Sequence, residues 1–234
     1  MKIKKTVIVL HGWGLSGAKY KGLVEFLSHT LHVLAPDLPG FGNEPKMSRQ
    51  MDLSDYVYFV DTLMKKENTT KAILIGHSFG GRIAIKYAWE HPEKVSKIIL
   101  TGVPIIRHIS LFKRVAFLLA MSGKKTTKVL PNKLQSFLRK LLYFTLGEWD
   151  YYKAGDLQGT FKNIINEDLV QYMEVLKIPI LLVWGENDSF TPVSDVAIIK
   201  KHVSYAQVAI VSHVGHNLPY AYPMLFYQKI RSFL

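Results

Sequence analysis

Residues 71–81 read Lys-Ala-Ile-Leu-Ile-Gly-His-Ser-Phe-Gly-Gly, a short apolar run that ends in a glycine-rich turn. The turn contains Gly76-His77-Ser78-Phe79-Gly80, which satisfies the pattern G-x-S-x-G. The apolar run predicts a strand, and the pattern that follows, Phe79–Glu90, predicts a helix. A serine in such a turn has a strained backbone and an exposed hydroxyl at the end of the strand. Because glycine turns are common, the rest of the chain decides whether Ser78 is a nucleophile.

Five more apolar runs flank this segment, and they read as strands that are buried on both faces. Helical patterns separate most of them, which predicts a doubly wound, mainly parallel α/β sheet of about six strands. The expected strands are Lys5–His11, Leu31–Pro36, Lys71–Gly76, Ser96–Thr101, Ile178–Trp184 and Ala206–Ser212. The expected helices are Ala18–His29, Leu53–Lys66, Phe79–Glu90 and Val193–His202, with a closing segment at Met224–Leu234.

The interval between the strands at Ser96–Thr101 and Ile178–Trp184 breaks this alternation. It holds helical patterns but no convincing pair of strands. A loop of that length is uncommon in a compact domain unless it forms a functional lid. We therefore expect residues 1–104 and 178–234 to form the core, and residues 105–177 to form an inserted helical cap.

Two polar residues follow later strands in an order that gives the serine a chemical context. Asp188 comes after the strand at Ile178–Trp184, and His216 comes after the strand at Ala206–Ser212. Parallel sheets place their sites at the carboxyl ends of the strands. The chain order Ser, Asp, His predicts Ser78 as nucleophile, His216 as general base and Asp188 as the acid that orients the base. Thr191 and Pro192, just beyond Asp188, predict the start of a helix.

A second glycine motif competes for the same sheet. Gly12-Trp13-Gly14-Leu15-Ser16-Gly17 matches G-x-G-x-x-G after a strand and before a helix, and Asp37 lies 20 residues past Gly17. This is the context of a dinucleotide-binding fingerprint. Three agreeing placements of Ser, Asp and His outweigh one glycine motif, so we favour a hydrolase and keep a nucleotide-dependent oxidoreductase as an alternative.

Five segments match landmarks of one superfamily, in order along the chain. They are His11–Gly14, Asp37–Gly42, Gly76–Gly81, Gly185–Pro192 and Gly215-His216. With them the sequence resembles the α/β-hydrolase superfamily over essentially all of the chain outside the cap. The resemblance implies that the turn after the first strand shapes an oxyanion hole, with the backbone N–H groups of Trp13 and Phe79 as donors.

The resemblance also implies a reaction: cleavage of carboxylic esters through an acyl-enzyme intermediate, with small to medium acyl substrates. His77 and the cap residues Phe112, Phe117 and Phe144 are the expected substrate contacts. Lactone hydrolysis stays open, as does a ligand-binding receptor built on the same fold.

Composition excludes several other classes. The chain has 234 residues and no cysteine, so disulfides, thiolate nucleophiles and cysteine-bound zinc are ruled out. His213 and His216 lack an H-E-x-x-H arrangement, so we expect no metal, and no other cofactor. No run approaches the roughly 20 apolar residues that span a bilayer, and the apolar run at Val7–Leu10 is too short for a signal peptide. We expect a cytoplasmic protein whose partners do not include nucleic acid.

The net charge of +12 gathers partly in the predicted cap. Between residues 105 and 147 there is no Asp or Glu, and the basic residues are Arg107, Lys113, Arg114, Lys124, Lys125, Lys128, Lys133, Arg139 and Lys140. A basic cap over a serine site resembles the pimeloyl-acyl-carrier-protein methyl ester esterases, which also carry a His-Gly-Trp-Gly-Leu turn. That resemblance implies an acidic carrier protein as docking partner, whereas a charged surface that serves solubility explains the same residues.

Overall fold

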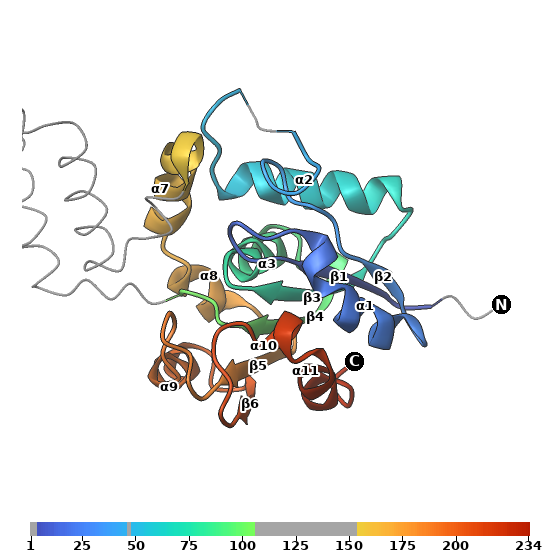
Figure 1. The fold of residues 1–234 in the computed structure, drawn as a ribbon, viewed down its shortest axis with the longest axis vertical. Helices are drawn as coiled ribbons and strands as arrows, with labels where there is room; N and C mark the ends of the chain where they lie inside the picture. The colour runs from blue at the N-terminus through green and yellow to red at the C-terminus, as the bar shows by residue number, and fades with distance from the viewer. Residues whose placement is uncertain (1–3, 46–47, 106–153) are drawn as a thin grey trace, which may run out of the picture. The chain divides into compact units, whose positions relative to one another are not determined.

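The computed structural model describes residues 4–45, 48–105 and 154–234. The chain divides into two compact units, one formed by residues 1–106 and 163–234, the other by residues 107–162. The first unit holds the sheet (Figure 1). The described residues of the second unit include the 3-10 helix η4 (Gly155–Leu157) and the first part of α7 (Gln158–Asn166). The predicted boundaries of the cap stay a prediction.

Six strands form one fully parallel sheet in the order β2-β1-β3-β4-β5-β6, which confirms the predicted α/β class. The strands are β1 (Thr6–Leu10), β2 (His32–Leu34), β3 (Ala72–His77), β4 (Val95–Thr101), β5 (Ile180–Gly185) and β6 (Gln207–Val211). The chain runs from β1 outward to β2 and then returns to β3 on the other side of β1. The ends of β1 and β3 therefore flank the switch point at which doubly wound sheets bind their ligands.

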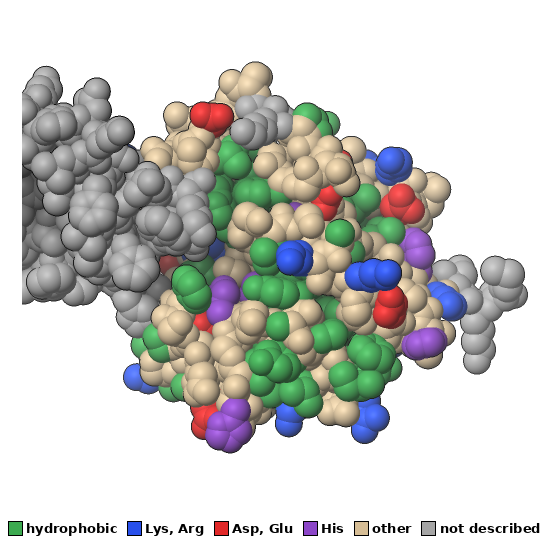
Figure 2. Space-filling view, in the orientation of Figure 1, with side chains coloured by type: hydrophobic (Ala, Val, Ile, Leu, Met, Phe, Trp, Pro, Cys, Tyr) green, Lys and Arg blue, Asp and Glu red, His purple; other side chains and the backbone are tan. Residues whose placement is uncertain are grey.

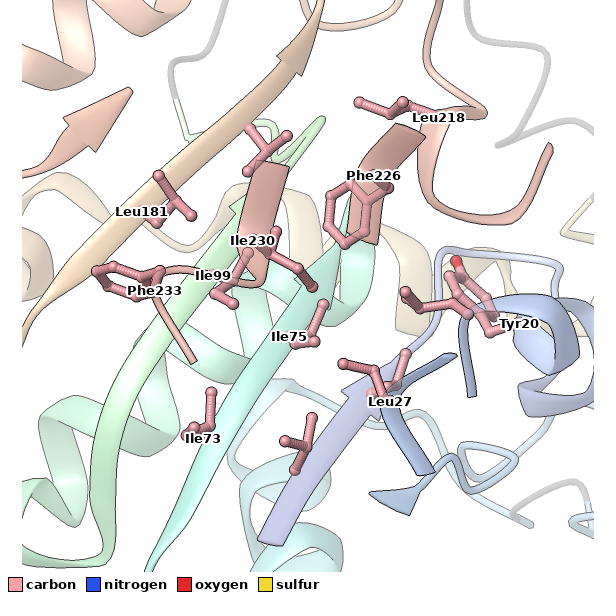
Figure 3. Close-up of a cluster of buried hydrophobic side chains, with 14 of the residues drawn as sticks. Tyr20, Leu27, Ile73, Ile75, Ile99, Leu181, Leu218, Phe226, Ile230 and Phe233 are labelled. Atoms are coloured by element: carbon pink, nitrogen blue, oxygen red, sulfur yellow. The ribbon is translucent and has the colours of Figure 1, made fainter. Parts of the chain in front are cut away.

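Helices cover both faces of the sheet (Figure 1). On one face lie α1 (Lys21–Ser28), α10 (Leu218–Ala221) and α11 (Pro223–Ile230). Their side chains, such as Leu27 and Phe226, close a buried cluster over Ile75 and Ile99 (Figure 3). Since successive side chains of a strand point to opposite faces of the sheet, the remaining side chains of each strand face a second layer of helices. That layer consists of α2 (Leu53–Lys66), α3 (Phe79–Glu90), α8 (Val170–Val175) and α9 (Ser194–His202).

Some predicted elements differ from the observed ones. The expected helix at Ala18–His29 is divided into the 3-10 turn η1 (Gly17–Tyr20) and α1. The second strand, at the edge of the sheet, ends at Leu34 rather than Pro36, and Pro36 has no N–H to donate to the ladder. By contrast, α2 and α3 begin and end at the predicted residues. Asp52 caps α2, because its carboxylate accepts from two N–H groups of the first turn.

The buried arginine Arg82 connects α3 to two distant stretches of the chain. Its guanidinium donates to the carbonyls of Pro104, Ile164 and Glu167. The carboxylate of Glu167 in turn pairs with Lys86 at 2.6 Å, one turn further along α3. The helix that follows Ser78 therefore anchors the chain on both sides of the interval between β4 and β5.

The outer surface near the C-terminus is partly apolar. Hydrophobic side chains gather over α10 and α11 in Figure 2, and Tyr222, Met224 and Leu225 are among the exposed ones. In the parts of the chain that the structure describes, no helix is long and apolar enough to cross a bilayer.

Candidate active site

Ser78 occupies a sharp turn between β3 and α3. Its backbone has φ 50° and ψ −114°, a conformation that is costly for any residue with a side chain. A methyl group on Gly76 would collide with the backbone of Gly81, so glycine at position 76 lets strand and helix approach closely. The Ser78 N–H donates to the Thr101 carbonyl at 2.9 Å, which ties the turn to the end of β4. The serine is thus fixed at the carboxyl edge of the sheet.

Asp188 follows β5 and is almost completely buried. Its Oδ1 accepts from the N–H groups of Phe190 and Thr191, both at 2.9 Å. Its Oδ2 accepts from the Thr191 hydroxyl and from His216 Nδ1, both at 2.8 Å. Burial alone would raise the pKa of the Asp188 carboxyl, but the hydrogen bonds from His216 and Thr191 outweigh it and hold the pKa below its ordinary value. The carboxylate is therefore ionised and fixed in orientation at neutral pH.

The His216 ring is oriented by this carboxylate. An ionised carboxylate can only accept, so Nδ1 carries the proton and Nε2 keeps a free lone pair, as a general base requires. The ring also packs against Phe190 and His77, with centroids 5.1 Å and 4.8 Å away. The predicted base and its predicted orienting acid, which are 28 residues apart in the sequence, thus lie in hydrogen-bond contact.

Gly102 brings the serine turn and the His216 ring together. It follows Thr101, the residue that receives the Ser78 N–H. A methyl group on Gly102 would lie 2.8 Å from His216 Cε1 and 3.2 Å from the Asp188 carboxylate. Among the described residues, no hydrogen bond joins the Ser78 hydroxyl to His216. In serine hydrolases this contact commonly tightens when substrate binds.

Two neighbours of Asp188 have roles that the sequence did not indicate. Glu186, which is also acidic and follows the same strand, accepts from the backbone N–H of His213 instead of the His216 ring. Thr191 does not start the next helix as predicted, because α9 begins at Ser194 and its cap position is Val193. The Thr191 side chain serves Asp188 instead, and the Asp-x-x-Thr spacing was the available signal.

The predicted oxyanion donors lie on two adjoining turns. The Trp13 ring packs edge-on against the rings of Phe79 and Phe41, with centroids 5.4 Å and 4.9 Å away. Phe79 also contacts Tyr56 at 4.8 Å. Because Phe79 is the first residue of α3, its N–H has no acceptor in the helix's own ladder. This aromatic cluster keeps the turn after β1 next to the start of α3.

His11 sets the orientation of the first of these turns. Its Nε2 accepts from the Leu38 N–H at 2.9 Å, and its Nδ1 donates to the Gly12 carbonyl at 2.8 Å. Burial lowers the pKa of the His11 imidazole, which matches this neutral tautomer. The Gly12 carbonyl and the Trp13 N–H belong to one planar trans peptide and point in opposite directions. The His11 bond to that carbonyl therefore also orients the Trp13 N–H.

Asp37 accounts for the competing glycine motif. Its carboxylate accepts from the N–H of Gly17 at 2.7 Å and of Asn43 at 2.8 Å. In a dinucleotide site this acid would bind a ribose hydroxyl, and the glycine turn would present free N–H groups to phosphate. Here Asp37 instead accepts from the N–H of Gly17, the last glycine of the motif, so these residues do not form the dinucleotide site that the oxidoreductase alternative requires.

His77 lies beneath the candidate site instead of lining it. The side chain is buried, with Nδ1 2.6 Å from the Tyr20 hydroxyl and Nε2 2.9 Å from the His216 carbonyl. Both ring nitrogens already bond within the protein, so His77 does not make the substrate contact that was expected from the sequence. The other expected contacts, Phe112, Phe117 and Phe144, lie outside the described residues, as do the basic residues of the predicted cap. Within the described ranges, no cluster of three His, Asp or Glu side chains could hold a metal ion.

Comparison with known proteins gives the class to which this site belongs. Residues 5–220 match the family described as alpha/beta hydrolase fold. The chain belongs to the α/β-hydrolase family.

Two relatives match nearly the whole chain. The "Pimeloyl-[acyl-carrier protein] methyl ester esterase" of Wigglesworthia glossinidia brevipalpis is 26% identical over 250 residues, which cover 97% of this chain and 93% of that protein. The mouse "Monoacylglycerol lipase ABHD6" (Mus musculus) is 25% identical over 262 residues, covering 99% and 76%. A solved structure, the α/β-hydrolase enzyme MGS-M2 from a Medee basin deep-sea metagenome library, has a TM-score of 0.75 at 18% identity and covers 100% of this chain and 90% of its own. The family and the names of these relatives support a hydrolase.

Proposed function

We propose that the protein hydrolyses carboxylic esters through an acyl-enzyme intermediate, with Ser78 as nucleophile, His216 as general base and Asp188 as the orienting acid. The observation that carries the proposal is the 2.8 Å bond between His216 Nδ1 and the Asp188 carboxylate. Both oxygens of that carboxylate also accept hydrogen bonds from Phe190 or Thr191. A structural histidine–aspartate pair needs no strained serine beside it. Here the pair lies next to a G-x-S-x-G turn in its expected strained conformation.

The proposed reaction follows from the protonation states of the three residues. As Ser78 Oγ attacks the acyl carbon, its proton moves to His216 Nε2, and the carbonyl oxygen becomes negative. The backbone N–H groups of Trp13 and Phe79 donate to that oxygen, and loss of one such donor typically costs on the order of 100-fold or more in turnover. The intermediate then expels the alcohol, which takes the proton from Nε2. Water repeats the sequence on the acyl-serine and releases the acid.

The substrate class is proposed from the relatives and the sequence together. An esterase and a lipase match nearly the full chain, which supports an acyl ester as substrate, and we propose acyl groups of small to medium length. We propose that residues 105–177 form the cap over this substrate, with Phe112, Phe117 and Phe144 as apolar contacts. Lactones share the same carbonyl chemistry and stay within the proposal.

A carrier-protein methyl ester is the second candidate substrate. Its support is specific: the pimeloyl-carrier esterase relative, together with nine Lys and Arg residues and no Asp or Glu between residues 105 and 147. An acidic carrier would complement such a positive segment.

A panel of p-nitrophenyl esters of increasing chain length tests the proposal, run beside a lactone and a carrier-protein methyl ester. We expect turnover of at least one ester, loss of that turnover in Ser78→Ala, and covalent labelling of Ser78 by a fluorophosphonate. Ligand binding without turnover or labelling would instead indicate a receptor on this fold.

A further inference from the structure

A chain of buried hydrogen bonds runs beneath the candidate site, and its proton positions can be assigned. The Gly12 N–H donates to the Tyr20 hydroxyl oxygen at 3.2 Å. The His216 carbonyl can only accept, so His77 Nε2 must be the donor in their 2.9 Å contact. A neutral imidazole then has only an acceptor at Nδ1, so the Tyr20 hydroxyl donates to it at 2.6 Å. Every donor in this chain has one acceptor, and the direction runs from Gly12 to His216.

The two middle residues of this hydrogen-bond chain are shielded from solvent. Tyr20 is 1% exposed and His77 is 2% exposed, and the Tyr20 ring belongs to the hydrophobic cluster of Figure 3. Tyr220 packs edge-on against both rings, with both centroid distances 5.8 Å. Burial, with the nearby His216 ring as a smaller cause, lowers the pKa of His77 to about 3, so the ring stays neutral. Breaking one link would leave buried polar atoms without a partner, which is costly.

The two ends of this chain of hydrogen bonds lie at the proposed oxyanion turn and at the proposed base. Gly12 directly precedes Trp13, the proposed oxyanion donor, and His216 is the proposed base. His77 directly precedes the nucleophile Ser78. We propose that Tyr20 and His77 are positioning residues that hold the oxyanion turn and the base in register around Ser78, an inference that rests on the proposed ester hydrolysis.

The inference explains why an imidazole occupies a position without solvent or substrate contact. Asp188 fixes the His216 ring, whereas His77 donates to the His216 carbonyl and so fixes its backbone. The base is therefore held at its side chain and at its backbone by different partners. Likewise, His11 holds the Gly12 carbonyl while Tyr20 holds the Gly12 N–H. An error of about 1 Å in such a site can cost on the order of 100-fold in rate.

The experiment removes one hydroxyl and compares it with a matched deletion elsewhere. Tyr20→Phe keeps the ring in the core but breaks both bonds of the hydroxyl. Tyr87→Phe removes an equally buried hydroxyl, which bonds to Asp61 and Met64 near the far end of α3. Both variants lose some stability, so melting temperatures are measured first and kinetics are run well below them. For Tyr20→Phe we expect kcat to fall roughly 10- to 100-fold with KM within about twofold, since positions in the transition state change while substrate binding does not.

Two substitutions at His77 each keep one of its two hydrogen bonds and break the other. Glutamine places an amide nitrogen where Nε2 was, so His77→Gln keeps the bond to the His216 carbonyl and loses the acceptor for Tyr20. Asparagine places an amide oxygen where Nδ1 was, so His77→Asn keeps the Tyr20 bond and frees the His216 backbone. We expect the pH profile of kcat/KM to shift in His77→Asn, where the base is released, and to stay near wild type in His77→Gln.

The outcomes separate this inference from the proposed function. Wild-type turnover and fluorophosphonate labelling with kcat of Tyr20→Phe equal to that of Tyr87→Phe would overturn the positioning role alone. Identical pH profiles in the two His77 variants would do the same for the base half of it. A wild-type chain that neither labels nor hydrolyses any ester overturns the proposed function, and the positioning role with it.

Discussion

The Thr191 hydroxyl donates to Oδ2 of Asp188 at 2.8 Å. The same oxygen accepts from the His216 ring, and the Thr191 N–H occupies the other oxygen. Thr191 therefore contacts both oxygens of the carboxylate. Its side chain helps to fix the angle at which the carboxylate meets the ring.

Replacing Thr191 by valine should separate these contributions, because valine has nearly the same shape but no hydroxyl. A hydrogen bond to a charged, buried carboxylate contributes about 1.5–3 kcal/mol, so the free energy of unfolding should fall by that amount. We also expect kcat to fall about tenfold as the carboxylate loses its orientation. Urea titration and ester kinetics measure both, with Thr191→Ser, which keeps the hydroxyl, as the control. Unchanged stability and turnover in Thr191→Val would show that the bond is dispensable.

The identity of the acid can be tested by exchanging two neighbouring carboxylates for amides. Asp188→Asn should lower kcat by about 10⁴-fold, since an amide can stabilise the wrong tautomer of the His216 ring. Glu186→Gln should change kcat by less than about twofold, because Glu186 only accepts from a backbone N–H at the surface. A severe effect of Glu186→Gln beside a mild one of Asp188→Asn would reverse the assignment.

Gly102 should be sensitive to a single methyl group. It has φ +57°, and a Cβ there would press on the His216 ring and the Asp188 carboxylate. Gly102→Ala should lower kcat by roughly 100-fold, since the base would be displaced. Gly155→Ala is the control: its φ is +53° and the space around it is open, so it should cost only about 1–2 kcal/mol of stability. Equal kinetics in the two variants would mean that the His216 ring can move aside at no cost to the reaction.

The buried His77 should make stability depend on pH. In the unfolded chain a histidine takes up a proton below about pH 6.5, whereas burial lowers the pKa of folded His77 to about 3. Between these values the unfolded state binds more protons, so the free energy of unfolding falls as the pH drops. The slope for this residue is up to about 1.4 kcal/mol per pH unit. Chemical unfolding from pH 7 to pH 4 should show a smaller slope in His77→Gln than in wild type. Parallel curves would mean that the folded protein protonates His77 as readily as the unfolded chain does.

The basic segment can be tested by salt. If it docks an acidic carrier protein, added salt should lower kcat/KM for a carrier-bound ester, because attraction between exposed charges is screened within about 8 Å at physiological ionic strength. A small neutral ester should show little change. Reversing two of the charges, Arg114→Glu and Lys125→Glu, should impair the carrier substrate and spare the small ester. If both substrates respond alike, the charge serves solubility.

Much of the fold and the identity of the candidate site residues could be predicted from the sequence, for clear physical reasons. Strands buried on both faces read as continuous apolar runs, and α3 matched its prediction because Gly76–Gly81 marks its start so sharply. The order of Ser78, Asp188 and His216 then placed them at one edge of the sheet. In a parallel sheet that edge is set by topology alone, so no knowledge of contacts was needed.

The supporting residues could not be found in this way. Tyr20 and His77 are 57 residues apart, and His77 and His216 are 139 apart, so their bonds depend on how the layers pack. Neither residue falls into a motif that specifies such a partner. The sequence therefore indicated a substrate contact at His77, because its position beside Ser78 was visible while its burial was not. Thr191 was misread for a different reason: a threonine before proline is typical of a helix start, and that pattern outweighed the Asp-x-x-Thr spacing that also fits a side-chain bond to Asp188.

The left-handed backbone of Ser78 has a consequence for how this chain is maintained in evolution. Holding a residue with a side chain in that conformation costs about 1–3 kcal/mol of folding free energy, whereas glycine adopts it with little strain. A protein kept only for its shape would gain stability by replacing this serine with glycine. If Ser78 is the nucleophile, as we propose, random substitution continually offers a more stable but unreactive chain, and selection for the chemistry of the hydroxyl opposes it. In a collection of mutants selected for thermal resistance alone, we expect glycine at position 78 to be among the first changes that raise stability and abolish activity.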